Sequence, residues 1–396
     1  MKYKKFTRFI IIVAVFVSTA VGINAQTDES TQKLAARMVL SASLKPGDVV
    51  MIDGGKHMIP LMEAVAIEVQ KAGGMPVMFL YTDRVTRSYY TDVPEKFLEL
   101  EPRFWGEWYK NANVLISLPT SEDNAALFQG VSETKMAKIN KAFDFLNAAV
   151  SSLPIRVVSA DFPSKKDAEL VGLDFPVYEK LMMDGIYADP ALMTATGGNL
   201  RQLLTGAKQV RITTAAGTDF TFSLAPGREV YIDDAVVTQE RAKSKLIAQR
   251  LAALPGGNVF FAPLETSANG KIVVPKARCR FAPMDNVSFE FKNGKLQNFK
   301  AAGNAECFEE RMKANTGPKD MFGTIWIGTN PSLKVVEDGK ANFRPFNAAG
   351  MVYIGVGENR IYGGSNNANF GYSFPITNAT VSIDGKTVVK DGKLVL

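Results

Sequence analysis

Short apolar runs and amphipathic stretches alternate along the first half of the chain. A turn at residues 44–48 precedes the apolar run 49–52, and residues 58–71 then carry apolar side chains at helical spacing. Further apolar runs stand at 76–80, 114–118 and 155–158, with amphipathic stretches at 95–109 and 135–149 between them. Because apolar strands that alternate with helices are typical of a parallel sheet covered on both faces, this half predicts a doubly wound, mainly parallel α/β domain.

The pattern changes after about residue 205. Asn-Gly-Lys or Asp-Gly-Lys occurs at residues 269–271, 293–295, 338–340, 384–386 and 391–393. Since Asn-Gly and Asp-Gly tolerate the positive φ of tight hairpin turns, we expect each to join two antiparallel strands. Helices are expected at 237–254 and 305–313. The second half therefore predicts an α+β domain rich in antiparallel sheet, and we divide the chain into residues 1–25, 26–200 and 201–396.

The first 25 residues have the three parts of a secretory signal peptide. A cationic head at residues 1–8 precedes the apolar core 9–17 and a smaller, more polar tail, with cleavage expected after Ala25. A retained signal anchor is the alternative, but the apolar core is shorter than the ~20 residues of a membrane span. We therefore expect an exported protein, periplasmic or extracellular, with no stable membrane span after signal removal.

Charge and composition exclude two classes of protein. The chain has 46 Lys and Arg against 40 Asp and Glu, a net charge of +6. The signal segment contributes +4 of this, so the remainder carries about +2, too little for a phosphate-tracking surface, and we expect no nucleic-acid partner. A hydrophobic fraction of 46% with 22% charged residues also excludes extensive disorder.

Cysteine and histidine are scarce. Cys279 and Cys307 either form one disulfide, which export would permit, or remain as two buried thiols. His57 is the only histidine, which excludes a multi-histidine metal site. It follows Gly54-Gly55-Lys56 between a predicted strand and a predicted helix, the place where α/β sheets bind ligands, although the spacing of a phosphate-binding P-loop is absent.

Several motifs resemble those of the aminopeptidase T family of metallo-aminopeptidases. In order, they are residues 44–50 (LKPGDVV), 72–77 (AGGMPV), 211–222 (RITTAAGTDFTF), 254–263 (LPGGNVFFAP), 328–331 (GTNP), 350–357 (GMVYIGVG) and 363–366 (GGSN). The resemblance covers most of the chain after the signal segment. It implies an α/β domain followed by a β-rich domain that carries two catalytic metal ions, and it implies a homodimer.

The ligand positions of that family are not kept. They correspond here to Asn258 and Thr324 in place of glutamates, Tyr353 in place of a histidine, Arg360 in place of a catalytic tyrosine, and Gly371 and Ser373 in place of a histidine-x-aspartate pair. Two divalent ions need several anionic oxygens or imidazoles to offset their repulsion and replace lost hydration. Neutral ligands and an added arginine predict a cleft without catalytic metals, so no catalytic residue is assigned.

Other side chains offer two alternatives. Carboxylates near the motifs could form a replacement metal site, or they could be solvated surface charges: Glu265, Asp285, Glu290, Asp320 and Glu358. Asp233-Asp234 is interpreted as a turn, with a paired acid–base device as the alternative. Aromatic residues close to an asparagine-rich segment could bind a neutral polar ligand, or could serve core packing beside a turn: Tyr353, Tyr362, Tyr372 and Phe374 with Asn366, Asn367 and Asn369.

The sequence therefore predicts an exported, non-catalytic homologue of metallo-aminopeptidases with a binding or scaffolding role and no cofactor. Its expected partners are peptides or another small polar ligand and a second copy of the chain. The alternative is an active exported aminopeptidase that releases N-terminal residues with an unconventional site for zinc, cobalt or manganese.

Overall fold

The computed structural model describes residues 29–396, apart from the side chain of Asn147. The predicted signal segment 1–25 and its cleavage site lie outside the described residues. Among the helices that the structure describes, none has the length and apolar character needed to cross a membrane.

The first half is built on a five-stranded parallel sheet with the order β2-β1-β3-β4-β8. Its strands are β1 (Val49–Gly55), β2 (Met75–Tyr81), β3 (Val114–Ser117), β4 (Arg156–Ala160) and β8 (Leu251–Leu254). Neighbouring strands all run parallel. The first four strands confirm the four predicted apolar runs.

Helices cover both faces of this sheet, as alternate residues of its strands require. Val50 and Ile52 pack with α1 (Glu29–Ser41) and α2 (Ile59–Lys71). Met51 faces the other way, toward a cluster that contains residues of α4 and α6. These two helices span Arg103–Tyr109 and Glu133–Ser152. The doubly wound α/β prediction is therefore confirmed.

Shorter elements complete the first half. The helices are η1 (Lys56–Met58), α3 (Asp83–Thr91), η2 (Glu95–Phe97), α5 (Asn124–Phe128), α7 (Lys165–Val171), α8 (Phe175–Ile186) and α9 (Pro190–Leu204). The helix expected over 95–109 is broken, because Pro102 precedes α4 and biases the backbone of its neighbour Glu101 away from the helical region.

Two antiparallel sheets form the second half, which confirms its predicted fold class. One has the order β12-β11-β10-β6-β5-β16-β17-β18 and the other β15-β14-β13-β9-β7. The first contains β5 (Val210–Thr213), β6 (Asp219–Phe222), β10 (Asn269–Cys279), β11 (Ala282–Lys292), β12 (Lys295–Ala302), β16 (Thr380–Ile383), β17 (Lys386–Lys390) and β18 (Lys393–Leu394). The second contains β7 (Val230–Asp233), β9 (Asn258–Phe261), β13 (Phe322–Gly328), β14 (Val352–Gly357) and β15 (Gly371–Ile376).

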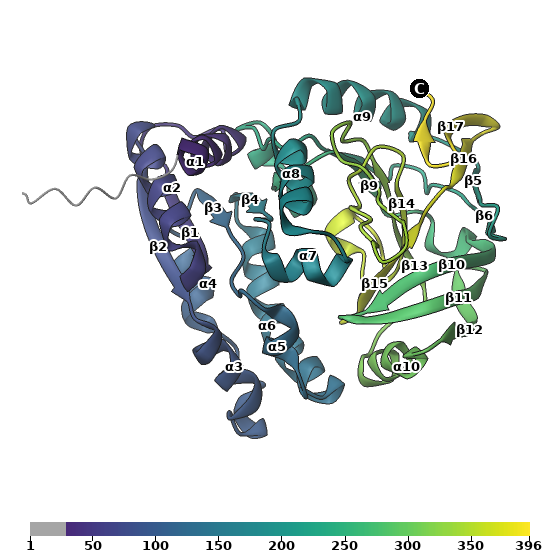
Figure 1. The fold of residues 1–396 in the computed structure, drawn as a ribbon, viewed down its shortest axis with the longest axis horizontal. Helices are drawn as coiled ribbons and strands as arrows, with labels where there is room; N and C mark the ends of the chain where they lie inside the picture. Colours follow the sequence, from purple (N-terminus) through teal and green to yellow (C-terminus); the bar gives the residue numbers. More distant parts are fainter. Residues whose placement is uncertain (1–28) are drawn as a thin grey trace, which may run out of the picture.

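A large apolar core joins these two sheets. It contains Phe220 and Phe289 from one sheet, Phe261 and Ile354 from the other, and residues of α9. Figure 1 shows the parallel sheet with its helices on the left and the antiparallel sheets on the right. Each half of the fold thus has a core of its own.

The helix predicted over 237–254 is wrong. The segment forms two short 3₁₀ turns, η3 (Arg241–Lys243) and η4 (Ile247–Arg250), and then β8. Strand β8 pairs with β4, so the chain returns to the parallel sheet after residue 201. Burial of Ala252 and Leu254 against that sheet outweighs the helical spacing of the segment, as tertiary contacts commonly do.

The Asx-Gly turns are confirmed in part. Those at 293–294, 384–385 and 391–392 join consecutive antiparallel strands, and that at 338–339 lies between the bridged residues Val336 and Phe343. The expectation for Asn269-Gly270 is wrong, because these residues begin β10. A Cβ atom on Gly270 would lie 2.2 Å from the Asp219 carbonyl oxygen, so glycine is needed here because β10 and β6 approach closely.

The helix expected over 305–313 is confirmed as α10 (Ala305–Ala314). A disulfide joins Cys307 of this helix to Cys279 at the end of β10. Arg280, the next residue, pairs with Glu133 of α6 at 2.6 Å. The disulfide therefore fixes α10 beside a contact between the two halves of the chain.

Candidate functional site

One face of the β15-β14-β13-β9-β7 sheet carries a row of aromatic rings. Tyr231, Phe260, Trp326 and Tyr353 are successive register partners on four neighbouring strands, so their side chains share a face. The Tyr231 and Phe260 rings are 5.4 Å apart, and the Phe260 and Trp326 rings are stacked at 4.7 Å. Tyr362 meets both Phe260 and Trp326 edge to face, at 5.4 and 5.5 Å.

Asn258 lies at one end of this face. It pairs with Gly328 of β13 and with Asp233 of β7, and it is only 1% exposed. Its Nδ2 donates a long hydrogen bond of 3.5 Å to Asp233 Oδ2, while its Oδ1 is buried without a partner. The Asp233 carboxylate also accepts from the backbone N–H groups of Ala235 and Ala253. Burial nevertheless raises the pKa of Asp233 to about 7.

Thr324 and Ser373 lie together at the other end. Both flank Gly355, since a Cβ atom there would meet Thr324 Oγ1 at 2.1 Å and Ser373 Oγ at 3.3 Å. Thr324 Oγ1 accepts a hydrogen bond of 3.2 Å from Trp326 Nε1. Because Thr324 precedes Gly328, the partner of Asn258, by four residues, about 13 Å separates it from Asn258 along the sheet.

At the other positions taken from the family motifs, the side chain either has a partner within the protein or is absent. The Tyr353 hydroxyl donates to the Arg344 carbonyl oxygen at 2.7 Å, and burial raises the pKa of Tyr353 to about 12, so the phenol stays neutral. Arg360 pairs with Glu358 at 2.9 Å. Gly371 begins β15 and offers no side chain. The structure thus brings Thr324, Ser373 and Tyr353 to one region and separates them from Asn258.

These donors do not fit two divalent cations. Between residues 29 and 396 no group of three or more His, Cys, Asp or Glu side chains is arranged to hold a metal. Glu265, one of the carboxylates considered as a replacement, pairs with Arg228 at 3.0 Å. Burial alone would raise the pKa of Glu265, but hydrogen bonds from the Ser365 N–H and Asn359, with the Arg228 charge, bring it below its ordinary value.

The remaining carboxylates are dispersed. Asp320 pairs with Lys295 at 3.3 Å, and Glu358 pairs with Arg360. Asp285 and Glu290 lie on exposed positions of β11. Asp234 forms an ion pair with Arg241 at 2.7 Å instead of acting with Asp233.

The asparagine-rich segment is structural at its buried end. Asn366 is buried and donates to the carbonyl oxygens of Phe322 and Gly357 at 2.8 and 3.0 Å. Phe374 belongs to the apolar core. Tyr353 and Tyr372, in contrast, line a groove of about 330 Å³ together with Ser373. Apolar residues and the guanidinium-bearing Arg278 and Arg344 complete it: Leu170, Val171, Phe343, Pro345 and Pro375.

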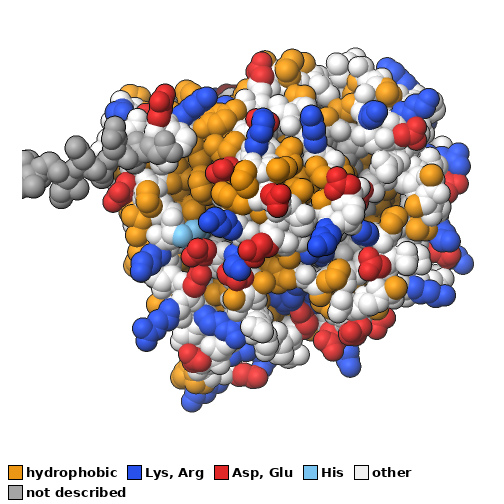
Figure 2. Space-filling model, in the orientation of Figure 1, with side chains coloured by type: hydrophobic (Ala, Val, Ile, Leu, Met, Phe, Trp, Pro, Cys, Tyr) orange, Lys and Arg blue, Asp and Glu red, His pale blue; other side chains and the backbone are white. Residues whose placement is uncertain are grey.

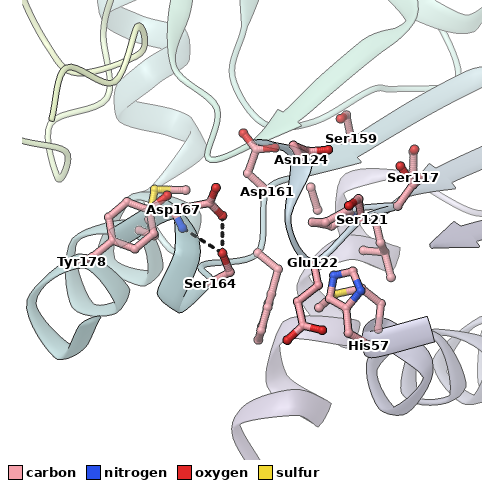
Figure 3. Close-up of a pocket in the computed structure, with 17 residues that line it drawn as sticks. His57, Ser117, Ser121, Glu122, Asn124, Ser159, Asp161, Ser164, Asp167 and Tyr178 are labelled. Carbon is pink, nitrogen blue, oxygen red and sulfur yellow. Dashed lines mark hydrogen bonds between the residues drawn. The ribbon is translucent and has the colours of Figure 1, made fainter. Parts of the chain in front are cut away.

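A larger pocket of about 450 Å³ lies in the first half, outside the positions selected from the family motifs. It forms where β1, β3 and β4 end, from the loops that follow these strands (Figure 3). In the sheet order, β1 has β2 on one side and β3 on the other, which makes this a topological switch point. Polar side chains dominate the lining: His57, Ser117, Ser121, Glu122, Asn124, Ser159, Asp161, Ser164, Asp167 and Tyr178.

Local packing positions these side chains. A Cβ atom on Gly55 would lie 2.7 Å from the Thr120 carbonyl oxygen and 2.6 Å from the His57 ring, so glycine lets the loops after β1 and β3 touch. Ser164 caps α7 by accepting from the Asp167 N–H at 3.0 Å, and its hydroxyl donates to Asp167 Oδ2 at 2.6 Å (Figure 3). His57 itself reaches the surface among acidic and basic side chains (Figure 2).

The sequence pointed to His57 but not to the rest of this pocket. The available signal was the polar residues at the ends of two apolar strands, Ser117 on β3 and Ser159 on β4, with Asp161 directly after β4. At the carboxyl edge of a parallel sheet such residues lie near one another.

Two protein-family models match different parts of this chain. Residues 27–181 match the thermophilic metalloprotease (M29) family, which confirms the resemblance found in the sequence. Residues 188–396, more than half of the chain, match the family described as NicX, 2,5-dihydroxypyridine 5,6-dioxygenase, and the chain belongs to that family. The dioxygenase description was not predicted from the sequence.

Two solved structures share the whole fold. Wild-type AmpT from Thermus thermophilus has a TM-score of 0.71 at 15% identity, covering 92% of this chain and 99% of AmpT. The 2,5-dihydroxypyridine dioxygenase from Pseudomonas putida KT2440 has a TM-score of 0.58 at 15% identity, covering 92% of this chain and 96% of its own. No curated protein sequence matches significantly. At these identities the structures establish the fold alone.

Proposed function

We propose that the protein is an exported, non-catalytic relative of the metallo-aminopeptidases that binds peptides or another small polar ligand. The observation that carries the proposal is the aromatic row from Tyr231 to Tyr353, which occupies the sheet face between Asn258 and Thr324. At the positions equivalent to the family's ligands, the side chains are neutral or cationic and are used for internal contacts.

The groove beside Tyr353 and Ser373 is the proposed binding place. Its proline and aromatic walls suit an apolar peptide side chain, and the Arg278 guanidinium suits a carboxylate, whereas Arg344 is already paired with Glu337. The Tyr372 hydroxyl donates to the Arg278 carbonyl oxygen within the second half of the chain. The Arg278 guanidinium donates to the Leu170 carbonyl oxygen and so joins this wall to the first half.

Metal analysis combined with turnover assays tests the absence of catalysis. The protein without its first 25 residues is assayed with leucyl chromogenic substrates and with 2,5-dihydroxypyridine in air, each with added zinc, cobalt or manganese and with a chelator. AmpT and the Pseudomonas dioxygenase serve as parallel controls. We expect substoichiometric metal and no turnover. Stoichiometric metal with chelator-sensitive turnover would favour an active enzyme and overturn the proposal.

Thermal shift measurements test the binding role. A ligand of the native state raises the melting temperature by an amount set by its concentration over its Kd. We expect leucyl dipeptides to raise it and the Arg278→Gln variant to lose the effect. An equal shift in the variant would place binding elsewhere.

Export and dimerisation are part of the same proposal. N-terminal sequencing of the processed protein should begin at Gln26. For the dimer, the supporting surface is the edge strand β2, where Met78 and Leu80 are 43% and 45% exposed. Light scattering should give twice the chain mass, and Leu80→Lys should give the monomer. A wild-type monomer would refute dimerisation.

A further inference from the structure

The pocket at the ends of β1, β3 and β4 carries negative charge that the protein leaves unpaired. Glu122, Asp161 and Asp167 line it, and within residues 29–396 none of these carboxylates forms an ion pair. Asp167 accepts the Ser164 hydroxyl, whereas no side chain or backbone group in the same range donates to the Asp161 carboxylate. An unpaired carboxylate at such a place is available to a cation from outside.

Asp161 faces the interior of the pocket. Its side chain is open to solvent, yet it follows a central strand and lies opposite Asp167 and Tyr178 (Figure 3). Desolvation by the pocket walls raises the pKa of Asp161, and the Asp167 carboxylate raises it further. A positive charge placed between Asp161 and Asp167 would relieve their mutual repulsion.

The carboxylates are arranged for an extended ligand. No group of three acidic, histidine or cysteine side chains within the described residues is close enough to ligate one metal ion. The pocket instead spreads hydroxyl and amide groups along its walls, namely Ser117, Ser121, Ser159 and Asn124, and adds the rings of Phe162 and Tyr178. Such walls suit a ligand with several hydroxyl groups and apolar C–H faces.

We propose that this pocket binds a small polyhydroxylated amine such as an amino sugar. Its ammonium group lies between Asp161 and Asp167, and its hydroxyl groups exchange hydrogen bonds with the serines and Asn124. The volume of about 450 Å³ falls within the range of small-molecule pockets. This site lies in the other half of the chain from the groove of the proposed function, and it does not depend on whether the second half is catalytic.

Calorimetric titration with three sugars of similar size tests the proposal at neutral pH. Glucosamine is the cation, glucose the neutral analogue and glucuronate the anion. Since a charge-assisted hydrogen bond distinguishes the first from the second, we expect glucosamine to bind at least about tenfold more tightly than glucose and glucuronate to bind most weakly. Glucose or glucuronate binding as tightly as glucosamine, or no binding of glucosamine, would overturn the proposal.

Matched variants locate the binding. Asp161→Asn keeps the shape of a solvent-accessible side chain and should reduce glucosamine affinity about tenfold while changing glucose affinity little. Asp167→Asn should act in the same direction, which guards against a local folding effect at either position. Glu169→Gln, on the same helix as Asp167 but paired with Lys166 on the surface, should leave both affinities unchanged. Equal loss in Glu169→Gln, or none in either aspartate variant, would refute the assignment to this pocket.

Discussion

Asn258 Nδ2 lies 3.5 Å from Asp233 Oδ2 across the β7–β9 pair. The resemblance to the aminopeptidase T family assigns the position of this amide to a metal ligand, and the Asp233 carboxyl beside it is buried. Asn258 Oδ1 has no partner. A half-turn rotation of the amide would place Oδ1 beside Asp233, where it could accept a hydrogen bond from the protonated carboxyl. The raised pKa of Asp233 favours a neutral carboxyl beside this amide.

This pair predicts a pH-dependent stability. Burial raises the pKa of Asp233 from its ordinary value of 3.8 to about 7, so between these pH values the native state holds a proton that the unfolded state has lost. The free energy of unfolding should therefore decrease as pH rises from about 4 to about 7 and level off above, by up to roughly 4 kcal/mol. Urea denaturation at pH 5 and pH 8 measures this decrease.

Asp233→Asn isolates the contribution of this carboxyl. The substituted amide can still accept from the Ala235 N–H and can donate to Asn258, so we expect it to be more stable than the wild type at pH 8 and close to it at pH 5. Asp320→Asn, at an exposed ion pair, should not change the pH dependence. A wild-type stability that rises between pH 5 and pH 8 relative to Asp233→Asn would contradict the raised pKa.

The contact between Gly355 and Thr324 predicts non-additive substitutions. Gly355→Ala places a methyl group 2.1 Å from Thr324 Oγ1 and should lower the free energy of unfolding by about 1–3 kcal/mol. Thr324→Ala alone removes the acceptor of Trp326 Nε1 and should cost about 1 kcal/mol. The double variant should cost clearly less than the sum, because the second change removes the atom that the first one strikes. Strict additivity in urea denaturation would show that the two residues do not touch.

The sequence predicted the fold where local pattern and tertiary packing agree. The apolar runs at 49–52, 76–80, 114–118 and 155–158 are short and alternate with amphipathic stretches, and each forms a strand of the parallel sheet. The helix prediction at 237–254 was wrong because residues 251–254 pair with β4 as a further strand of the parallel sheet. The local sequence pattern contains no information about that long-range pairing. The turn prediction at Asn269-Gly270 was wrong because an Asn-Gly pair is also found where a glycine lets two strands approach closely, and the sequence alone does not distinguish the two cases.

The candidate sites were predictable to different extents. The motifs located Asn258, Thr324 and Tyr353, but not the aromatic row, since Phe260 and Trp326 become neighbours only through the register of β9 and β13. To predict the pocket near His57, one must know that the ends of β1, β3 and β4 lie side by side. Sequence spacing cannot supply that, because helices α5 and α6 separate Ser117 from Asp161 along the chain.

Substitution of Gly55 tests how closely the loops around the pocket are packed. Gly55 has a φ of −75°, which alanine also adopts without strain. The effect of Gly55→Ala should therefore come from contact of the new methyl group with the Thr120 carbonyl oxygen and the His57 ring. We expect a loss of about 1–3 kcal/mol in stability and weaker glucosamine binding. Gly198→Ala, in α9 with open space around it, is the matched control and should stabilise by about 0.5–1 kcal/mol. An unchanged stability and affinity in Gly55→Ala would mean that the loops adjust freely.

The disulfide between Cys279 and Cys307 predicts a dependence on the redox state of the compartment. It closes a sequence separation of 28 residues, for which loss of unfolded-state entropy gives a stabilisation of about 3–4 kcal/mol. Replacing both cysteines by alanine should lower the free energy of unfolding by about that amount, and a thiol reductant should lower that of the wild type similarly without affecting the double variant. Because α10 lies beside the Arg280–Glu133 ion pair, the loss should also loosen the contact between the halves, measured as faster hydrogen exchange at the start of α6. A wild-type protein indifferent to reductant would show that the two thiols are not joined, and would remove the chemical reason for linking this fold to an oxidising compartment.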